Sequence, residues 1–177
     1  EMLEDAGHTV VGEAADGLEA LELVRKEKPD IVLLDIKMPR LDGIHAARMI
    51  GHEGLAPVLL LTAYSQDDMV DKAKDSGVLG YLVKPVSPVN LFPAIEIAIA
   101  QFARQREAAR QLEEMNDRIE TRKAVDRAKG CLMDLYHISE DEAYRRLQQY
   151  SMKNRKPLKT VAESVIAGAE KIKGQKK

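Results

Sequence analysis

Three short apolar runs, each of which ends on a polar residue, constrain the fold of this chain more than any other feature. The runs are residues 31–34, which end on Asp35, residues 58–61, which end on Thr62, and residues 81–83, which end on Lys84. A continuous apolar run of this length, bounded by turn residues, is typical of a strand that is buried on both faces. Because segments with helical periodicity lie between the runs, we expect an α/β fold with a doubly wound parallel sheet.

Capping residues and apolar spacing predict the individual elements. Strands are expected at residues 9–14, 31–35, 57–62 and 78–83, and helices at 17–27, 43–50, 65–76 and from Pro88 onward. Asp16 is a suitable N-cap for the helix at 17–27, whose Leu18, Leu21 and Val24 would face inward.

The polar residues at the strand ends predict a single site. The carboxyl ends of parallel strands meet at one edge of a sheet, where open α/β folds place their ligands, so Asp35, Thr62 and Lys84 should lie together. A carboxylate beside a hydroxyl and a lysine suits acyl-phosphate chemistry, in which the carboxylate is the nucleophile and the lysine neutralises phosphoryl oxygens. A cis Lys84–Pro85 peptide would direct the lysine inward. The alternative is that Asp35 and Thr62 only cap helices.

Residues 8–102 resemble the receiver domain of two-component response regulators, which has a flavodoxin-like fold. The residues that carry the resemblance are Asp35, Met38-Pro39, Asp42-Gly43, Thr62-Ala63, Tyr81 and Lys84-Pro85. It implies that a sensor histidine kinase phosphorylates Asp35, that Thr62 and Lys84 contact the phosphoryl group, and that Tyr81 is the aromatic switch. It also implies Mg²⁺ bound by Asp35, the backbone carbonyl of Lys37 and two upstream acids.

The start of the sequence departs from the receiver pattern. Receivers carry their acidic pair at the end of a first strand, whereas residues 1–7 have the pattern of the last turns of the helix that follows it, with Gly7 as its stop. Glu4 and Asp5 are therefore not the acidic pair. We expect that about 25–30 residues precede Glu1 in the native protein, including the central strand that would pair with residues 9–14. We also expect weak Mg²⁺ binding by this chain, because one carboxylate and one carbonyl are few ligands.

Beyond Pro93 the composition is typical of a long helix. Residues 94–135 contain no proline and a single glycine, Gly130, and good helix formers dominate. A weak heptad seam gives this helix a coiled-coil tendency; it comprises Ala98, Phe102, Ala109, Leu112, Met115 or Asn116, and Ile119. Residues 137–139 should end the helix, Ser139 should cap a second helix to about Met152, and a third is expected over 158–171.

The two halves of the chain carry opposite net charge. Residues 1–100 hold 9 Lys and Arg against 17 Asp and Glu, whereas residues 101–177 hold 18 against 12. Basic patches displace counterions from nucleic-acid phosphates. The alternative is a solvated amphipathic bundle, which is what runs of charge usually indicate. The candidate RNA-binding residues are Arg118, Arg122, Lys123, Lys129, Arg145, Arg146, Lys153, Arg155 and Lys156.

Residues 112–168 resemble the ANTAR domain, a family of three-helix RNA-binding antiterminators. The matching segments are Arg122-Lys123-Ala124-Val125, Ala128-Lys129-Gly130, Leu132-Met133, residues 139–144, Leu147, Asn154-Arg155-Lys156, Leu158 and Val161-Ala162. Two departures are Ser151, where the family usually has alanine, and Pro157 beside the basic turn. The resemblance implies paired RNA stem-loops and two copies of the domain. Tyr144 and Tyr150 could stack on unpaired bases, but we expect both to pack within the bundle.

These patterns predict four segments: a receiver domain at 1–92, incomplete at its N-terminus, a linker helix at 93–115, an ANTAR domain at 112–170 and a basic tail at 171–177. The predicted function is a cytoplasmic, phosphorylation-controlled transcription antiterminator that binds RNA hairpins and dimerises on phosphorylation, with no enzymatic activity beyond self-dephosphorylation. The switch would expose a dimerisation face on residues 70–76 and 78–83. No apolar run is long enough to cross a membrane. The alternatives are a DNA-binding output and a C-terminal module for dimerisation or protein docking.

Overall fold

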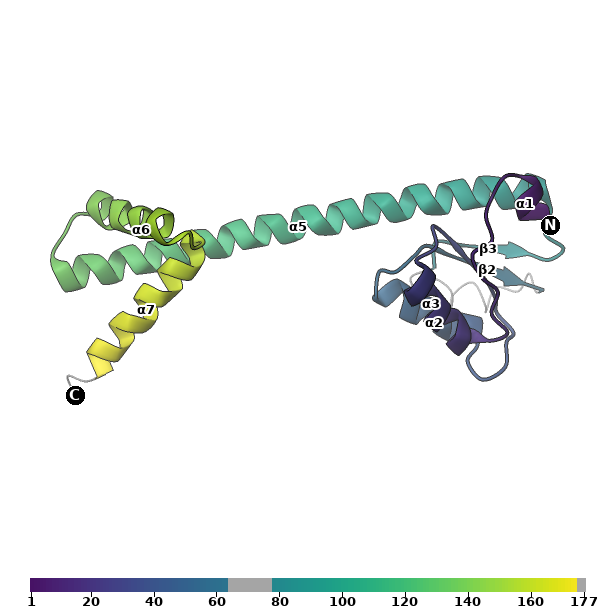
Figure 1. Cartoon of the computed structure of the whole chain (residues 1–177), viewed down its shortest axis with the longest axis horizontal. Helices are drawn as coiled ribbons and strands as arrows, with labels where there is room; N and C mark the ends of the chain where they lie inside the picture. Colours follow the sequence, from purple (N-terminus) through teal and green to yellow (C-terminus); the bar gives the residue numbers. More distant parts are fainter. Residues whose placement is uncertain (64–77, 175–177) are drawn as a thin grey trace. The chain divides into compact units, whose positions relative to one another are not determined.

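The computed structural model describes residues 1–63 and 78–174, and the chain divides into two compact units, Glu1–Ala108 and Ala109–Lys177. The elements in chain order are α1 Met2–Asp5, α2 Gly17–Glu27, β1 Val32–Asp35, α3 Gly43–His52, β2 Val58–Thr62, β3 Gly80–Val83, α5 Pro88–Tyr136, α6 Glu140–Asn154 and α7 Leu158–Gly174 (Figure 1). The helix expected at 65–76, with its part of the proposed switch face, lies outside the described residues. Among the helices that are described, none combines the length and the apolar character needed to cross a membrane.

A three-stranded parallel sheet, in the order β1–β2–β3, organises the first unit. Asp35 lies opposite Leu61, and Thr62 lies opposite Val83, so the three strands end at the same edge. The strand predicted at residues 9–14 is wrong, since these residues have no regular secondary structure. A strand needs a neighbour for its backbone hydrogen bonds, and β1 pairs only with β2 among the described strands.

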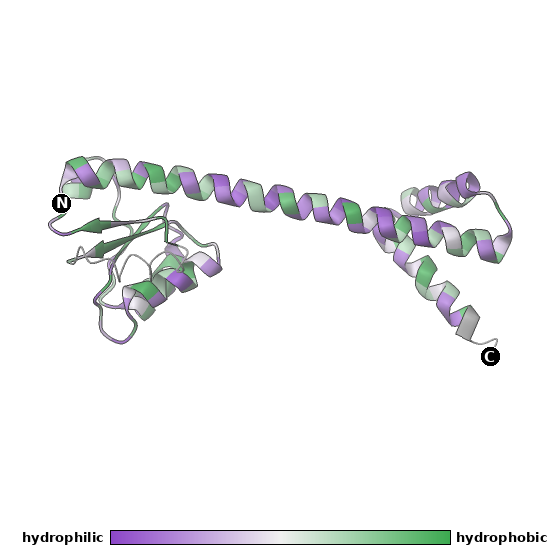
Figure 2. Ribbon diagram, turned by 180° about the vertical axis from the view of Figure 1, so that it is seen from behind, coloured by the Kyte–Doolittle hydropathy of each residue, from purple (hydrophilic) through white to green (hydrophobic). Residues whose placement is uncertain are grey.

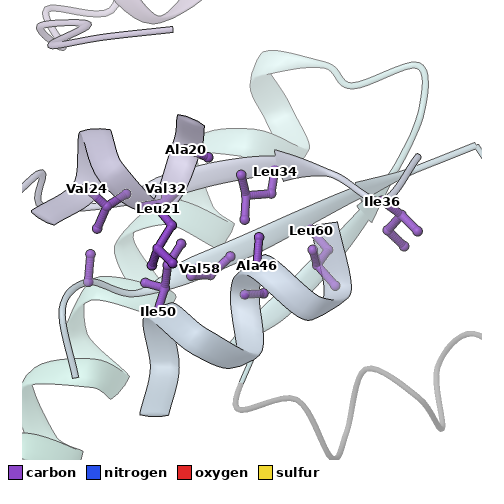
Figure 3. Packing of buried hydrophobic residues seen from close by; sticks show 12 residues of the cluster. Ala20, Leu21, Val24, Val32, Leu34, Ile36, Ala46, Ile50, Val58 and Leu60 are labelled. Atoms are coloured by element: carbon purple, nitrogen blue, oxygen red, sulfur yellow. The ribbon is translucent and has the colours of Figure 1, made fainter. Parts of the chain in front are cut away.

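Both faces of the sheet are covered by helices, as the continuous apolar runs predicted. Val32, Leu34, Val58 and Leu60 point to one face, where they pack with residues of α2 and α3 in a single core (Figure 3). The alternate residue Leu59 points to the other face and packs with Leu91, Ile95 and Ala98 at the start of α5. Because side chains alternate between the two faces along a strand, α2 and α3 cover one face of the sheet and the start of α5 covers the other.

Local capping explains where the short helices begin and end. Asp16 caps α2 by accepting hydrogen bonds from the N–H groups of Leu18 (2.9 Å) and Glu19 (3.1 Å), as predicted. Leu18, however, is 45% exposed, so the prediction that it faces inward is wrong; Leu21 and Val24 are buried. Gly7, with a φ of +84°, follows α1, and the N–H of His8 donates to the Leu3 carbonyl at 3.0 Å, which confirms the predicted helix stop.

A single helix, α5, runs through both units from Pro88 to Tyr136 and includes Pro93. The sequence allowed one helix or two nearly collinear ones, and the structure has one. Beyond the residues that cover the sheet, apolar side chains are interspersed among polar ones along α5 (Figure 2). Leu112, Met115 and Ile119 of the heptad seam are 61%, 59% and 49% exposed.

The second unit contains the end of α5 together with α6 and α7. Its core contains Val125 and Ala128 of α5, Leu147 of α6, and Val161 and Ala162 of α7. The Ser139 hydroxyl accepts the N–H of Glu142 at 3.3 Å, so the predicted cap of the second helix is confirmed. Alanines in the core allow the three helices to approach closely.

Candidate functional site

The acidic residue at the end of β1 and the lysine after β3 are in direct contact. The Lys84 ammonium donates a hydrogen bond to Oδ2 of Asp35 and forms an ion pair with it. The backbone N–H of Lys37 donates to Oδ1 of Asp35 at 3.2 Å. The Lys84–Pro85 peptide is cis.

Thr62 completes the edge of the sheet between these two residues. It ends β2 and is 4% exposed, and its carbonyl accepts the N–H of Lys84 at 2.7 Å. On the other side, the N–H of Ile36 donates to the Leu61 carbonyl at 3.1 Å. The backbone therefore brings the three predicted residues Asp35, Thr62 and Lys84 to one edge of the sheet.

Electrostatics keep the carboxylate ionised. The Lys84 ammonium holds the pKa of Asp35 below its usual value, with help from the Lys37 N–H, while partial burial acts in the opposite direction. The side chains of Asp35 and Lys84 are each 40% exposed, so the pair is open to solvent and to a reaction partner. An ionised, accessible carboxylate is the form that a nucleophile requires.

The loop after Asp35 is anchored by close backbone contacts. The N–H of Gly43 donates to the Ile36 carbonyl at 3.0 Å, and a Cβ at position 43 would lie 2.0 Å from the Asp35 carbonyl oxygen. The Asp42 carboxylate accepts the N–H of His45 at 2.9 Å and so caps α3. The Asp42-Gly43 pair thus caps a helix and allows that helix to approach the end of β1.

A second anchor of this loop was not predicted from the sequence. Asp16, which is 2% exposed, accepts a hydrogen bond from Nε of Arg40, a loop residue with a φ of +60°. Burial alone would raise the pKa of Asp16, but the N–H groups of Glu19 and Leu18 and the Arg40 guanidinium together hold the pKa below its usual value. The N–H of Gly17 also donates to the Leu41 carbonyl at 3.1 Å. The N-cap role of Asp16 was predicted from the sequence, but its hydrogen bond with the distant residue Arg40 was not.

Tyr81 is placed on β3, opposite Leu60 in the register, and is 45% exposed. Within the described residues it has no hydrogen bond to Asp35, Thr62 or Lys84. It is therefore close to the site in the sheet but is not part of the contact network.

The described residues supply an incomplete set of ligands for Mg²⁺. Asp35 and the Lys37 carbonyl are the two predicted donors, and Asp16 is engaged with Arg40. No group of three or more His, Cys, Asp or Glu side chains that could hold a metal occurs in the described part of the chain. We therefore assign no step to a metal ion.

Five of the nine candidate RNA-binding residues have acidic partners within the second unit. Lys129, whose side chain is 16% exposed, pairs with Asp126 at 2.7 Å and Glu140 at 2.6 Å, and these two carboxylates raise its pKa. The other pairs are Arg145–Glu142 (3.4 Å), Arg146–Glu142 (3.1 Å), Lys123–Glu120 (2.9 Å) and the long contact Arg122–Asp126 (4.0 Å). The charge of Lys129 is the one most fully compensated, because two carboxylates face it.

The remaining four candidates, Arg118, Lys153, Arg155 and Lys156, form no ion pair with any described residue. Three of them lie in the last turn of α6 or just after it, and we call Lys153, Arg155 and Lys156 the basic turn. Ser151 fixes this turn, since its hydroxyl donates to the Lys156 carbonyl at 2.6 Å and its carbonyl accepts the Lys156 N–H at 3.1 Å.

The two tyrosines of α6 are exposed rather than buried in the bundle core. Tyr144 is 40% exposed and Tyr150 is 54% exposed, so the expectation that both are packed is wrong. Their spacing of six residues along α6 separates them on the helix surface. Both rings are accessible to a binding partner.

Comparison with known families matches both halves of the chain. The family model of the response regulator receiver domain matches residues 1–96, and that of the ANTAR domain matches residues 113–166. The transcriptional regulatory protein PdtaR of Mycobacterium tuberculosis strain H37Rv is 45% identical over 166 residues, which cover 94% of this chain and 81% of that protein.

Solved structures resemble the receiver half. The signal receiver domain of a modulated diguanylate cyclase from Desulfovibrio desulfuricans G20 is 31% identical, with a TM-score of 0.54, and the match covers 59% of this chain and 83% of that one. The receiver domain of the response regulator NarL from Mycobacterium tuberculosis is 35% identical, with a TM-score of 0.53, over 56% of this chain and 82% of that one. The chain therefore belongs to the response regulators of two-component systems and joins an N-terminal receiver domain to a C-terminal ANTAR domain.

Proposed function

We propose that this response regulator is phosphorylated on Asp35 by a sensor histidine kinase and that its ANTAR domain then binds RNA hairpins to act as a transcription antiterminator. The observation that carries the proposal is the presence of both chemistries on one chain. Asp35 contacts Lys84 at the edge of the receiver sheet, and the unpaired charges of the basic turn lie in the ANTAR domain. A receiver implies a kinase partner, and an ANTAR domain implies RNA.

The geometry at Asp35 suits phosphoryl transfer. An oxygen of the Asp35 carboxylate attacks the phosphorus of the kinase phosphohistidine, the phosphorus–oxygen bond forms, and the phosphorus–nitrogen bond breaks as the imidazole leaves. Lys84 then neutralises a phosphoryl oxygen, and the Thr62 hydroxyl donates a hydrogen bond to another. Water attack on the acyl phosphate returns the carboxylate and inorganic phosphate, and this self-dephosphorylation is the extent of the chemistry.

The proposed switch links this site to dimerisation. Phosphorylation adds charge at Asp35, draws Thr62 toward it, and lets Tyr81 move inward from its exposed position. The exposed seam residues Leu112, Met115 and Ile119 of α5 then pair with those of a second copy. Two linked ANTAR domains bind two hairpins with higher affinity, because the second binding event becomes intramolecular.

A phosphorylation test examines the receiver. The chain is incubated with a small phosphodonor, with and without Mg²⁺, and the labelled aspartate is identified by mass spectrometry. We expect slow labelling at Asp35, because the described metal-ligand set is incomplete, and no labelling in Asp35→Asn. Asp30→Asn, two residues before β1, is the matched control and should label as the wild type does. Labelling on another residue in the wild type contradicts the assignment.

A binding test examines the output. Affinity is measured for hairpin RNA and for duplex DNA over a range of salt concentrations, with the phosphorylated wild type and with Asp35→Asn. We expect a preference for hairpin RNA and a higher affinity after phosphorylation. Preference for duplex DNA would favour the DNA-binding alternative, and no nucleic-acid binding would favour a module for protein docking. Equal RNA affinity of Asp35→Asn and the phosphorylated wild type would refute the switch.

A further inference from the structure

A cavity of about 350 Å³ lies in the ANTAR domain beside the basic turn, and we call it the bundle pocket. Its lining comes from all three helices of the bundle and from the turn after α6. Its apolar floor includes Leu132, Leu147 and Val161, of which Leu147 and Val161 are 1% and 2% exposed. The floor is thus a part of the bundle core that reaches the surface.

The rim of the bundle pocket is cationic and aromatic. It carries Arg146, Tyr150 and Lys156, and no carboxylate is among the residues that line the pocket. An occupant that satisfies this lining has a flat apolar part for the floor and the Tyr150 ring, and a negative charge for the rim. A nucleotide has both, with its base and its phosphate.

Tyr150 is suited to stack on a base. Its ring is 54% exposed. Its backbone carbonyl accepts a hydrogen bond from Nδ2 of Asn154 at 2.9 Å, which stabilises the last turn of α6. Aromatic side chains bind unstacked bases by their faces, and single-stranded loops are the RNA elements whose bases are free to do so. The pocket volume is at the small end of ligand sites, which suits one nucleotide.

Lys156 is suited to bind the phosphate. Its ammonium has no ion pair with any described residue, whereas its backbone N–H donates to the Ser151 carbonyl and its carbonyl accepts the Ser151 hydroxyl. Arg146 has an ion pair with Glu142 at 3.1 Å, but a guanidinium has five N–H donors and retains some for a second acceptor. The backbone of Lys156 is therefore held in place, and its ammonium is available for a phosphate.

We propose that the bundle pocket receives one unstacked nucleotide from the loop of an RNA hairpin, with its base against Tyr150 and its phosphate on Lys156. This inference rests on the proposed RNA-binding function and adds the site at which a loop base is bound. It also assigns different roles to the two exposed tyrosines, because Tyr150 lines the pocket and Tyr144 does not.

The test uses the full chain and a hairpin selected from a library with a fixed stem and a randomised loop. Each loop position is replaced in turn by an abasic nucleotide, and binding is measured for the wild type, Tyr150→Leu and Tyr144→Leu. We expect one abasic position to weaken wild-type binding about tenfold or more, as loss of one stacked base does. Tyr150→Leu should weaken binding of the intact loop by a similar factor and be insensitive to that abasic position. Tyr144→Leu should bind the intact loop as the wild type does and remain sensitive.

The inference is tested by whether the losses in binding free energy caused by the protein substitution and by the abasic nucleotide add when the two are combined. Additive effects of Tyr150→Leu and the abasic position overturn the inference and leave the proposed function standing, whereas failure of the library to yield any bound hairpin overturns both. A second double-mutant cycle combines Lys156→Gln in the protein with a neutral methylphosphonate in place of the phosphate beside the same nucleotide. This cycle does not depend on whether Tyr150→Leu folds. Non-additive loss is expected there, and Lys153→Gln, which lies outside the pocket, is the matched control.

Discussion

The Asp35 carboxylate is held ionised by one neighbour more than by any other. Lys84 lowers the pKa of Asp35 through a hydrogen bond and its charge, and the residues come from strands that are separated by β2 in the sheet. The folded-state pKa therefore lies below the unfolded value of about 3.9. The resulting contribution to stability is fully present above that unfolded pKa and is lost as the pH falls through the folded pKa.

Replacement of the lysine tests this linkage at the residue scale. In Lys84→Gln we expect the pKa of Asp35 to rise toward its ordinary value, as measured by pH titration of its side-chain carboxyl signal in NMR. The acid-induced loss of folding free energy should still begin near the unfolded-state pKa, but it should be smaller and be complete at higher pH than in the wild type. The difference is modest, because the pair is exposed. Lys28→Gln, at an exposed position after α2, is the control and should leave the titration unchanged. An unchanged Asp35 pKa in Lys84→Gln would exclude the ion pair as the cause.

Single residues also show what sequence could and could not predict. Asp35, Thr62 and Lys84 were predictable because each follows an apolar run, and parallel strands bring such ends together. The contact between Asp16 and Arg40 was not, because it depends on the φ of +60° at Arg40 and on the path of a loop. Arg118 and Lys129 have the same charge in the sequence, but only the fold shows that Lys129 faces two carboxylates.

At the scale of elements, helices were predicted better than strands. The limits of α2 match the prediction because Asp16 and the apolar spacing are local signals. Residues 9–14 have the pattern of a strand but no described partner, and pairing is a non-local property. The exposure of Tyr144 and Tyr150 was missed for a related reason, since the small bundle core is already filled by alanine, valine and leucine.

The end of α6 offers a test that separates stability from binding. Arg155 follows the helix in the left-handed conformation, with a φ of 51°, where a side chain other than glycine is strained. Arg155→Gly should therefore raise the free energy of unfolding by about 1 kcal/mol and at the same time weaken binding to hairpin RNA, because it removes a charge from the basic turn. Thermal unfolding and RNA titration measure the two effects on one sample.

A matched variant lies in the other unit. Lys28 follows α2 with a φ of 50°, so Lys28→Gly should stabilise the receiver by a similar amount and leave RNA affinity unchanged. Loss of RNA binding in both variants would show that the effect is not specific to the basic turn. A fall in stability in Arg155→Gly would mean that the arginine side chain supports the fold.

At the scale of the whole molecule, α5 connects the two units within one helix, and its seam is the proposed dimer contact. Leu112→Glu places a charge in the seam at a side chain that is 61% exposed, so the single chain should remain folded. We expect this variant to lose phosphorylation-dependent dimerisation in analytical ultracentrifugation. It should also lose the affinity gained on RNA with two hairpins, while binding to one hairpin is retained. Val89→Glu, at an exposed apolar residue in the first turn of α5, is the control; equal dimerisation of all three proteins would rule out the seam.

Ion pairs within the ANTAR domain make the salt dependence of RNA affinity depend mainly on the cations that have no carboxylate partner there. A protein that neutralises about four phosphates of single-stranded RNA loses affinity with a slope of about −3 in a plot of log affinity against log salt. Arg118, Lys153, Arg155 and Lys156 are the four candidates without an ion pair in the described structure, so a slope near this value is expected for the wild type. Lys153→Gln combined with Lys156→Gln should make the slope shallower by one to two, by about 0.7 for each lost contact. Lys129→Gln should leave the slope unchanged, because Asp126 and Glu140 already compensate that charge. If Lys129→Gln changed the slope as much as Lys156→Gln does, RNA would have to displace both carboxylates, and the division into paired and unpaired cations would fail.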